Sequence, residues 1–390
     1  MASGLNSRKL LMLVPCDIFP PVHGGSTRVR FTIKHLLKTN QLNVLVNHVY
    51  SVGGKIELIH PNLSVRYCPK TTLDALGYRS VLFNPFYVKQ AHYLMRNTSS
   101  DIIQCELLWS APSGILLKKK FKRPLVLVDH NVEYLKFKEA GKFVYSLLLR
   151  TIEKKCCEQA DKIVVVSELD RDNLSILYDI PKEKIQVIRN CTDSDKFKYT
   201  QKGRNYVRQK YGIDNETIVI TFVGKLDYTP NVSAVKYIAG KIYPVILKDH
   251  PKTKFLIVGA NYKPLMNYQK KNIIFTGYVN NLADYLSASD IVIIPIDSGS
   301  GTRIKTLEAA SCSRPVVSTK KGTEGQDFRD KKEMMITDSV DQHFIECIKE
   351  LIEDEHMRET LGKNARQKIE NQYDWKQEIK KFEEVYEEVL

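Results

Sequence analysis

The chain has 390 residues, with 59 Lys and Arg against 45 Asp and Glu and a formal net charge of +14. Its hydrophobic fraction of 43% and charged fraction of 27% are those of a folded globular protein, which excludes a disordered chain. The length predicts two domains. Residues 1–160 hold 23 Lys and Arg against 10 Asp and Glu, whereas residues 161–390 are nearly neutral. We therefore expect any anionic partner to meet the first domain.

Several classes of protein are disfavoured by the same data. No stretch reaches the roughly 18–20 apolar residues of a membrane span, and the start of the chain lacks the features of a signal peptide. We therefore expect a cytoplasmic protein. The eight cysteines show no CxxC pair and no zinc-like spacing with histidine. We interpret them as reduced and mostly buried, and we expect neither a metal site nor a cofactor.

Short β-branched runs alternate with helical or loop segments along the chain, which is typical of parallel strands covered on both faces. The predicted strands of the first series are residues 10–14, 44–50, 102–106, 125–129, 162–167 and 185–189. Residues 190–212 form a polar stretch with no strong periodicity, and we interpret it as the linker between the two series. The second series is residues 218–223, 255–258, 273–275, 291–295 and 316–318.

This pattern predicts an α/β fold of two facing Rossmann-like domains, each a doubly wound parallel sheet, with a cleft between them. We place the first domain at residues 1–195 and the second at 196–373. Residues 374–390 carry one apolar stripe at helical spacing, and we expect this helix to pack back on the first domain. Ligands of such sheets bind beyond the carboxyl ends of the strands, so the loops there are the places to search for chemistry.

The loop after the first predicted strand contains Gly24 and Gly25 and leads into a helical segment at residues 30–38. Two glycines let the backbone approach a ligand closely, and a helix N-terminus offers N–H groups to an anion. A plain strand-to-helix turn explains the same residues equally well. The loop matches neither a Walker loop nor a GxGxxG fingerprint, which disfavours an ATPase or a dinucleotide dehydrogenase.

His130 follows the fourth predicted strand of the first series. A histidine at the tip of a buried strand can bind a sugar hydroxyl or stabilise developing charge. Taken by itself, a histidine that satisfies local backbone groups is the simpler interpretation.

Residues 296–319 form the richest segment, in which a strand, a Gly/Ser loop, a helix and a second strand follow one another. Arg303 and Lys305 lie near the predicted start of the helix, where a cation opposes the helix dipole unless an anion is bound. That conflict indicates a phosphate site. Glu308 has the chemistry to accept two ribose hydroxyls, and an Arg–Glu or Lys–Glu surface pair is the alternative.

Taken together, these stretches resemble the retaining glycosyltransferases of family 4, which have the GT-B fold. The pieces that carry the resemblance run in the family's order, and they are residues 20–25, 129–133, 187–197, 222–231, 301–309 and 322–325. The resemblance covers nearly the whole chain. It implies a nucleotide-diphosphate-sugar donor bound mainly by the second domain and a glycan, lipid-linked or other acceptor bound mainly by the first.

The resemblance also implies roles for individual residues. Glu308 matches the carboxylate that holds the ribose hydroxyls, and Lys225 matches a basic residue on the donor diphosphate. His130 matches the histidine near the donor sugar. The remaining positions that match donor-binding segments are Gly24, Gly25, Gly224, Ser300, Gly301, Thr302, Lys305 and Glu324.

The chain departs from the family's pattern at three positions. Ser300 stands where the family often has a second glutamate, so its sugar contact must come from Ser300 or from backbone amides. Asn231 stands where the family has a second basic residue, and we infer that Arg303 and Lys305 supply the missing charge. Cys191 replaces a glycine of the motif that joins the domains.

The resemblance implies a metal-independent hexosyltransferase. Lys225, Arg303 and the helix N-terminus stabilise the departing diphosphate while an oxocarbenium-like sugar develops. No carboxylate is an evident nucleophile, which fits the front-face reaction proposed for the family. Two other classes remain open: a nucleotide-sugar isomerase on the same fold, and a basic protein that binds nucleic acid or another anion through residues 118–123. No nucleic-acid recognition motif is found, so we expect no nucleic-acid partner.

The excess positive charge of the first domain leads to a separate hypothesis. Basic residues at 118–123 and at Lys136, Lys138, Lys142 and Arg150 stand beside the apolar residues 143, 144 and 147–149. Such interleaving favours peripheral contact with an anionic membrane, and burial of the apolar stripe in the domain core is the alternative.

Overall fold

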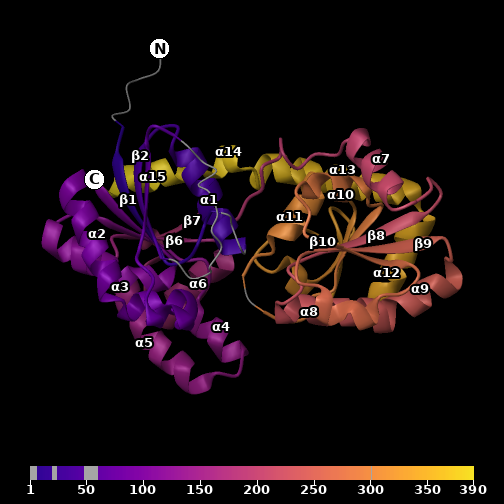
Figure 1. Ribbon diagram of the computed structural model, residues 1–390, viewed down its shortest axis with the longest axis horizontal. Coiled ribbons are helices and arrows are strands. Elements are labelled where there is room, and N and C mark those ends of the chain that lie inside the picture. The colour runs from indigo at the N-terminus through magenta and orange to yellow at the C-terminus, as the bar shows by residue number, and fades with distance from the viewer. Residues whose placement is uncertain (1–6, 20–23, 48–59, 300) are drawn as a thin grey trace, which may run out of the picture. The chain divides into compact units, whose positions relative to one another are not determined.

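The computed structural model describes residues 7–19, 24–47, 60–299 and 301–390 (Figure 1). The chain divides into two compact units. Unit 1 comprises Met1–Asn190 and Trp375–Leu390, and unit 2 comprises Cys191–Asp374. The first boundary therefore lies at residue 190, where the sequence placed it at 195.

The described residues of unit 1 form a seven-stranded parallel sheet in the order β3-β2-β1-β4-β5-β6-β7. Its strands are β1 (Lys9–Val14), β2 (Gln41–Val46), β3 (Leu63–Tyr67), β4 (Ile102–Glu106), β5 (Leu125–Val128), β6 (Lys162–Val165) and β7 (Ile185–Val187). Its helices are α1 (Gly24–Leu36), η1 (Thr72–Phe83), α2 (Pro85–Thr98), α3 (Leu107–Phe121), α4 (Glu133–Glu139), α5 (Phe143–Gln159), α6 (Glu168–Tyr178), η2 (Lys182–Lys184), α14 (Trp375–Glu378) and α15 (Lys380–Val389).

Unit 2 repeats this architecture with a six-stranded parallel sheet in the order β10-β9-β8-β11-β12-β13. Its strands are β8 (Ile218–Val223), β9 (Thr253–Val258), β10 (Ile273–Gly277), β11 (Ile291–Ile294), β12 (Val316–Thr319) and β13 (Met335–Thr337). Its helices are α7 (Gln201–Lys210), α8 (Thr229–Tyr237), η3 (Ile238–Ile242), α9 (Tyr243–Asp249), η4 (Lys263–Tyr268), α10 (Leu282–Ala288), α11 (Ile304–Ser311), η5 (Lys320–Thr323), α12 (Gln342–Glu353) and α13 (Glu355–Gln372).

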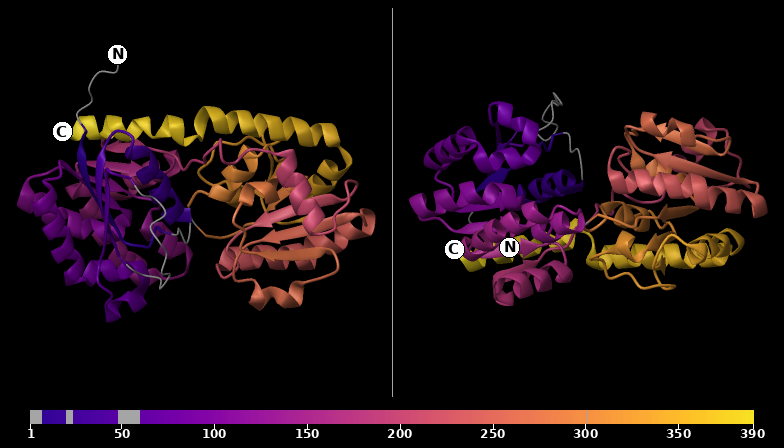
Figure 2. Two further views of the ribbon diagram at one scale, coloured as in Figure 1. Left: turned by 45° about the horizontal axis from the view of Figure 1, so that its top comes forward. Right: turned by 90° about the horizontal axis from the view of Figure 1, so that it is seen from below.

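Helices cover both faces of each sheet (Figure 2), and the side-chain alternation of the strands explains how. In β1, Leu11 and Leu13 belong to the core that includes α2, α3 and α5, whereas Leu10 and Met12 belong to the core on the opposite face with α1 and α15. Strands buried on both faces read as continuous apolar runs. For this reason the sequence predicts the central strands well.

The C-terminal segment completes unit 1. Phe382, Val385 and Tyr386 of α15 are buried in the same core cluster as Leu10 and Met12. The stripe at helical spacing is therefore the face that α15 packs on the sheet.

Some predicted elements differ from the structure. β3 and β13 were not predicted, because β3 alternates between intermediate and exposed positions and β13 has three residues. The stretch 190–212 begins at the boundary between the two units, as the linker interpretation expects, but it also contains α7, where Thr200 as the N-cap accepts a hydrogen bond from the Gly203 amide. α1 begins at Gly24, six residues before the predicted start at residue 30. Residues 48–50 of a predicted strand lie outside the described residues.

Both sheets have their topological switch point at the centre. The chain moves outward in one direction from β1 and in the other from β4, and it does the same from β8 and β11. Ligands of such sheets bind beyond the carboxyl ends of these strands. Among the described residues, no helix is long and apolar enough to cross a membrane. The eight cysteines are free and buried, as predicted.

Candidate functional site

The carboxyl end of β8 runs into a close turn at Gly224 and Lys225. A Cβ atom on Gly224 would lie 2.7 Å from Cγ of Asn231, so only glycine fits this approach. The Asn231 amide donates a 2.8 Å hydrogen bond to the Lys225 carbonyl and fixes the turn. The Lys225 side chain is 45% exposed, and its ammonium lies 3.3 Å from the Asp227 carboxylate. The turn therefore offers a cation at the switch point.

The loop between β11 and α11 is shaped by its glycines and by Arg303. Gly299 and Gly301 have positive φ angles of 86° and 85°, a conformation that favours glycine. Arg303 is the N-cap residue of α11, and its guanidinium donates to carbonyl groups of its own loop, to Gly299 at 2.6 Å and to Gly301. Thr302 directly precedes it, and Ser300 lies outside the described residues. Arg303 thus holds the loop in addition to any role toward a ligand.

Lys305 lies in the first turn of α11 and reaches toward β8. Its ammonium donates a 2.7 Å hydrogen bond to Asn231 Oδ1 and lies 4.5 Å from the centre of the Phe222 ring. Burial, with a smaller effect from the charge of Arg303, lowers the pKa of Lys305 to about 7. The side chain keeps part of its surface exposed. A bound anion would restore its charge.

Glu308 lies one turn further along α11. Burial raises the pKa of its carboxyl group to about 7, against the opposing charges of Lys196 and Lys305. Within the described part of the chain, no hydrogen bond to this carboxylate and no ion pair with Arg303 or Lys305 is formed. The surface pair considered from the sequence is therefore not formed. A partly buried carboxylate without a partner is suited to accept hydroxyl groups from a ligand.

Glu324 follows β12 and the short helix η5. Its carboxylate accepts a 2.7 Å hydrogen bond from the Lys321 ammonium. The Thr319 hydroxyl accepts a hydrogen bond from the Gly322 amide at 3.0 Å and caps η5. The structure therefore places Glu324 in an ion pair at the carboxyl end of the sheet of unit 2.

In unit 1, Gly24 and Gly25 are the first two residues of α1. The nearby Arg28 is buried, and its guanidinium donates to the carbonyls of Ile188 and Arg189, both at 2.8 Å. It also lies 5.5 Å from the centre of the Trp375 ring. The cation of this helix therefore ties α1 to the chain after β7.

His130 lies after β5 and is 5% exposed. Its Nε2 lies 3.0 Å from Glu106 Oε2, at the end of the adjacent strand β4. Burial lowers the pKa of His130, while the hydrogen bond and charge of Glu106 oppose that shift. The simple alternative, a histidine that satisfies backbone groups, does not describe this geometry, because the ring pairs with a carboxylate.

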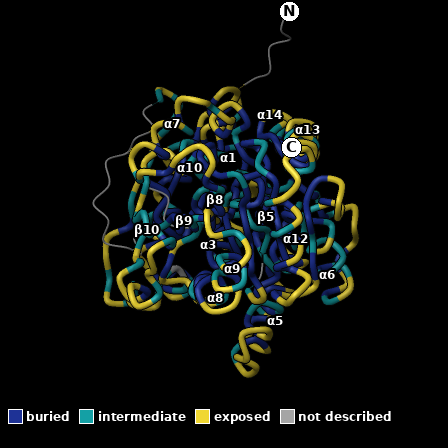
Figure 3. The backbone as a smooth tube through the Cα atoms, turned by 90° about the vertical axis from the view of Figure 1, so that its right-hand side faces the viewer, coloured by how far each residue is buried: buried dark blue, intermediate teal, exposed yellow. Residues whose placement is uncertain are grey.

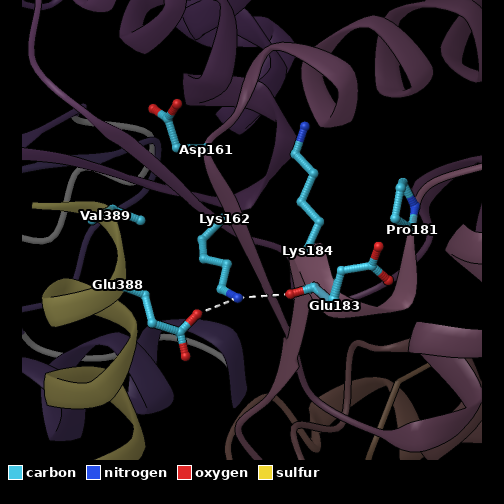
Figure 4. A pocket seen from close by; sticks show the side chains of 7 residues that line it. All are labelled: Asp161, Lys162, Pro181, Glu183, Lys184, Glu388 and Val389. Atoms are coloured by element: carbon cyan, nitrogen blue, oxygen red, sulfur yellow. Dashed lines mark hydrogen bonds and ion pairs between the residues drawn. The ribbon is translucent and has the colours of Figure 1, made fainter.

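A shallow pocket of about 410 Å³ lies elsewhere on unit 1 (Figure 4). It is lined by Asp161, Lys162, Pro181, Glu183, Lys184, Glu388 and Val389. The Lys162 ammonium bonds the Glu183 carbonyl at 2.7 Å and the Glu388 carboxylate. The pocket lies at the amino ends of β6 and β7, away from the edge where such sheets bind ligands. It contains no residue of the predicted site.

Two family models match the chain consecutively. "Glycosyltransferase Family 4" matches residues 23–196, and "Glycosyl transferases group 1" matches residues 217–354. The chain belongs to the family 4 glycosyltransferases. This glycosyltransferase is 25% identical to an uncharacterised glycosyltransferase of Methanocaldococcus jannaschii over 97% of its own length and 98% of that protein. It is also 25% identical to an Escherichia coli UDP-Gal:alpha-D-GlcNAc-diphosphoundecaprenol alpha-1,3-galactosyltransferase, over 59% of each chain.

Solved structures support the GT-B fold of this glycosyltransferase. Anabaena HepE in complex with UDP and glucose has a TM-score of 0.76 at 17% identity, covering 98% of this chain and 100% of that one. Sucrose-phosphate synthase from Thermosynechococcus elongatus has a TM-score of 0.80 at 15% identity, covering 98% of each chain. These neighbours confirm the predicted fold class.

The sequence did not single out Glu106, which contacts His130, or Lys196, whose charge acts on Glu308. The sequence did contain a signal for Glu106, because a charged residue ends a fully buried strand next to the switch point. Lys196 had none, because it stands in a lysine-rich polar stretch of the sequence.

Proposed function

We propose that this glycosyltransferase moves a hexose from a nucleoside-diphosphate sugar to a hydroxyl of a glycan or lipid-linked acceptor, with retention of anomeric configuration and without a metal ion. The observation that carries the proposal is the arrangement after β8 and β11. The Asn231 side chain lies between Lys305 and Lys225: its Oδ1 accepts from the Lys305 ammonium, and its Nδ2 donates to the backbone carbonyl of Lys225. On the same helix as Lys305, Glu308 offers a carboxylate that has no hydrogen-bond partner among the described residues.

Different residues of this site would bind different parts of the donor. The Lys225 and Lys305 ammonium groups and the N-terminus of α11 would bind the diphosphate, since all three favour negative charge. The Glu308 carboxylate would accept the two ribose hydroxyls. HepE was solved with UDP and glucose, and the E. coli relative is named for a UDP-galactose donor, which supports a UDP-sugar as the first donor to test.

The proposed reaction breaks the bond between the anomeric carbon and a phosphate oxygen. The electron pair of that bond stays on the diphosphate, whose negative charge is stabilised by the lysines. The acceptor oxygen attacks the same face of the sugar, and its proton passes to the departing phosphate oxygen. Retention follows, because the bond forms on the face from which the diphosphate leaves.

We also propose that the enzyme docks on an anionic membrane through α4 and α5, which project from unit 1 (Figure 1). Phe143, Val144, Leu147 and Leu148 are 58% to 86% exposed, whereas only Leu149 is buried. The alternative interpretation, burial of the stripe in the core, is therefore wrong for four of the five residues. Figure 3 draws much of α5 in the colour of exposed residues.

Cations surround this apolar face. Lys142 lies 5.7 Å from the centre of the Phe137 ring, and Arg150 lies 5.6 Å from that of Tyr134, so aromatic side chains hold both on the α4–α5 hairpin. Apolar side chains beside cations match the chemistry of an anionic leaflet, where a lipid-linked acceptor resides.

The test of the donor proposal is a binding screen of UDP-, GDP- and ADP-sugars by thermal shift, followed by calorimetry. A donor that binds only the folded state raises the melting temperature. We expect one nucleotide class to bind and its affinity to fall in Glu308→Ala. Failure of every nucleotide sugar to bind would overturn the proposal, and rapid conversion of the donor without an acceptor would favour an isomerase. The anomeric configuration of the product, read by NMR, tests retention.

A further inference from the structure

A buried chain of four polar side chains runs through unit 1 from the C-terminal helix to His130. The Tyr386 hydroxyl of α15 donates to Gln104 Oε1 on β4. Gln104 Nε2 donates to Glu106 Oε1 at 2.6 Å, and Glu106 Oε2 lies 3.0 Å from His130 Nε2. Each of the four side chains is at most 5% exposed. This series of hydrogen bonds therefore connects α15 to the loop after β5 through buried side chains.

The donors and acceptors in this series of hydrogen bonds determine which atom carries each hydrogen. A tyrosine hydroxyl donates to the Gln104 carbonyl oxygen, which leaves the Gln104 amide to donate to Glu106. The Glu106 carboxylate has only acceptors, so the hydrogen between it and His130 belongs to Nε2. In the neutral ring, Nδ1 is then an acceptor. Within the described residues this buried Nδ1 has no hydrogen-bond partner.

An unpartnered buried acceptor is costly, and no group in the described part of the chain satisfies it. The backbone beside Glu106 carries a second cost. Leu107, the first residue of α3, has a φ angle of 63°, in the left-handed region that a branched side chain avoids. Such strain persists only where the surroundings hold it in place, and it is common at functional sites.

We propose that Glu106 is a positioning residue for His130: its carboxylate holds the ring by Nε2–H, and it thereby presents Nδ1 to accept a hydrogen bond from a hydroxyl of the donor sugar. Gln104 and Tyr386 hold Glu106 in turn. This inference rests on the proposed function, together with the resemblance that implies a place for His130 near the donor sugar. It also gives α15 a part in the site, through the hydroxyl of Tyr386.

The first test reads the ring nitrogens directly. The full-length protein is labelled with ¹⁵N-histidine, and the signal of His130 is assigned by its loss in His130→Gln. At pH 7.5 we expect the chemical shifts of a neutral ring with the hydrogen on Nε2. A ring with the hydrogen on Nδ1 would overturn the inference, and so would a doubly protonated ring. This measurement needs no substrate and no variant of Glu106.

The second test separates the sugar from the nucleotide. UDP-glucose and UDP are titrated calorimetrically into the wild type, Glu106→Gln and Tyr386→Phe. A Gln side chain supplies one acceptor where Glu106 serves two donors. We therefore expect affinity for UDP-glucose to fall about tenfold in Glu106→Gln and about twofold in Tyr386→Phe, with UDP affinity unchanged. His130→Gln, which removes the ring itself, should show the same loss of affinity for UDP-glucose with UDP affinity unchanged.

The matched control is Tyr87→Phe, which also removes a buried hydroxyl from unit 1, one that donates to the Leu45 carbonyl at 3.3 Å. We expect it to bind both ligands like the wild type. Wild-type UDP-glucose affinity in Glu106→Gln would overturn the inference while the proposed function stands. Failure of the wild type to bind any nucleotide sugar would overturn the proposed function, and this inference with it. If Glu106→Gln does not fold, Tyr386→Phe and the wild-type spectrum decide.

Discussion

The ammonium of Lys305 donates a 2.7 Å hydrogen bond to Oδ1 of Asn231. The first of these residues is on α11 and the second on α8, 74 positions apart in the chain. Asn231 stands where the resemblance implies a basic residue, and the lysine that reaches it comes from another helix. The cation is thus present at the carboxyl end of β8, although the residue expected to carry it is an amide.

We predict that Lys305→Met weakens binding of UDP and of UDP-glucose alike, by about tenfold or more, because a hydrogen bond to a charged group is lost from the shared diphosphate. The double variant Lys305→Met/Asn231→Lys should recover part of that affinity, since it returns a cation to the position that the family uses. Calorimetry of the four proteins in this cycle measures the coupling.

Lys252→Met is the control for that cycle. Lys252 is exposed and forms an ion pair with Glu216 at the surface of unit 2. Its loss should leave both affinities unchanged, since an exposed pair contributes little. Equal binding by Lys305→Met and the wild type would remove Lys305 from the diphosphate site.

The pH dependence of UDP-glucose binding should be bell-shaped with its maximum near pH 7. Below about pH 7 Glu308 becomes protonated and loses its capacity to accept both ribose hydroxyls. Above about pH 7 Lys305 becomes neutral, with the Arg303 charge adding to the effect of burial. UDP-glucose suits this experiment because its diphosphate does not titrate in that range. Calorimetry between pH 5.5 and 8.5, in steps of about half a pH unit, measures both limbs of the binding curve.

Two variants assign those limbs. Glu308→Gln should remove the acid limb, and Lys305→Arg should remove the alkaline limb, because a guanidinium stays charged throughout. An acid limb that persists unchanged in Glu308→Gln would show that another group produces it.

The partly buried carboxyl group of Glu308 should also lower the free energy of unfolding at neutral and alkaline pH. Its pKa rises from 4.5 in the unfolded chain to about 7 in the folded one, so its contribution is most favourable below pH 4.5 and is lost as pH rises to about 7. Glu308→Gln has no such loss. We predict that this variant melts a few degrees above the wild type at pH 8 and close to it at pH 4.5. Thermal unfolding across that range checks the sign, and a constant difference at all pH values would contradict it.

The sequence predicted the sheets because their central strands are apolar on both faces, and β4 and β8 have the predicted bounds. It missed α7, whose few buried positions, such as Val207, give a weak apolar pattern. It could not predict contacts that depend on register and side-chain direction. Glu106 and His130 meet because β4 and β5 pair with Glu106 opposite Val128. Arg28, beside the two glycines in sequence, turns instead to the chain after β7.

The exposed face of α5 gives the last prediction. Val144→Asp/Leu148→Asp places two carboxylates on the face that we propose meets the lipid, where they lose apolar contact and repel anionic headgroups. Binding to vesicles of phosphatidylcholine with phosphatidylglycerol should fall at least about tenfold in co-sedimentation, because each side chain loses about 1 kcal/mol or more of apolar burial.

The control for this surface is Ile176→Asp, on α6 of the same unit. Ile176 is 81% exposed, close to the 86% of Val144, but it does not belong to the α4–α5 hairpin. It should sediment with the vesicles like the wild type. UDP-glucose binding in solution should be equal in all three proteins, because α5 lies outside the proposed donor residues. Salt should weaken wild-type sedimentation, since the flanking lysines act through charge. Binding that neither the paired aspartates nor salt reduces would exclude α5 as the docking surface.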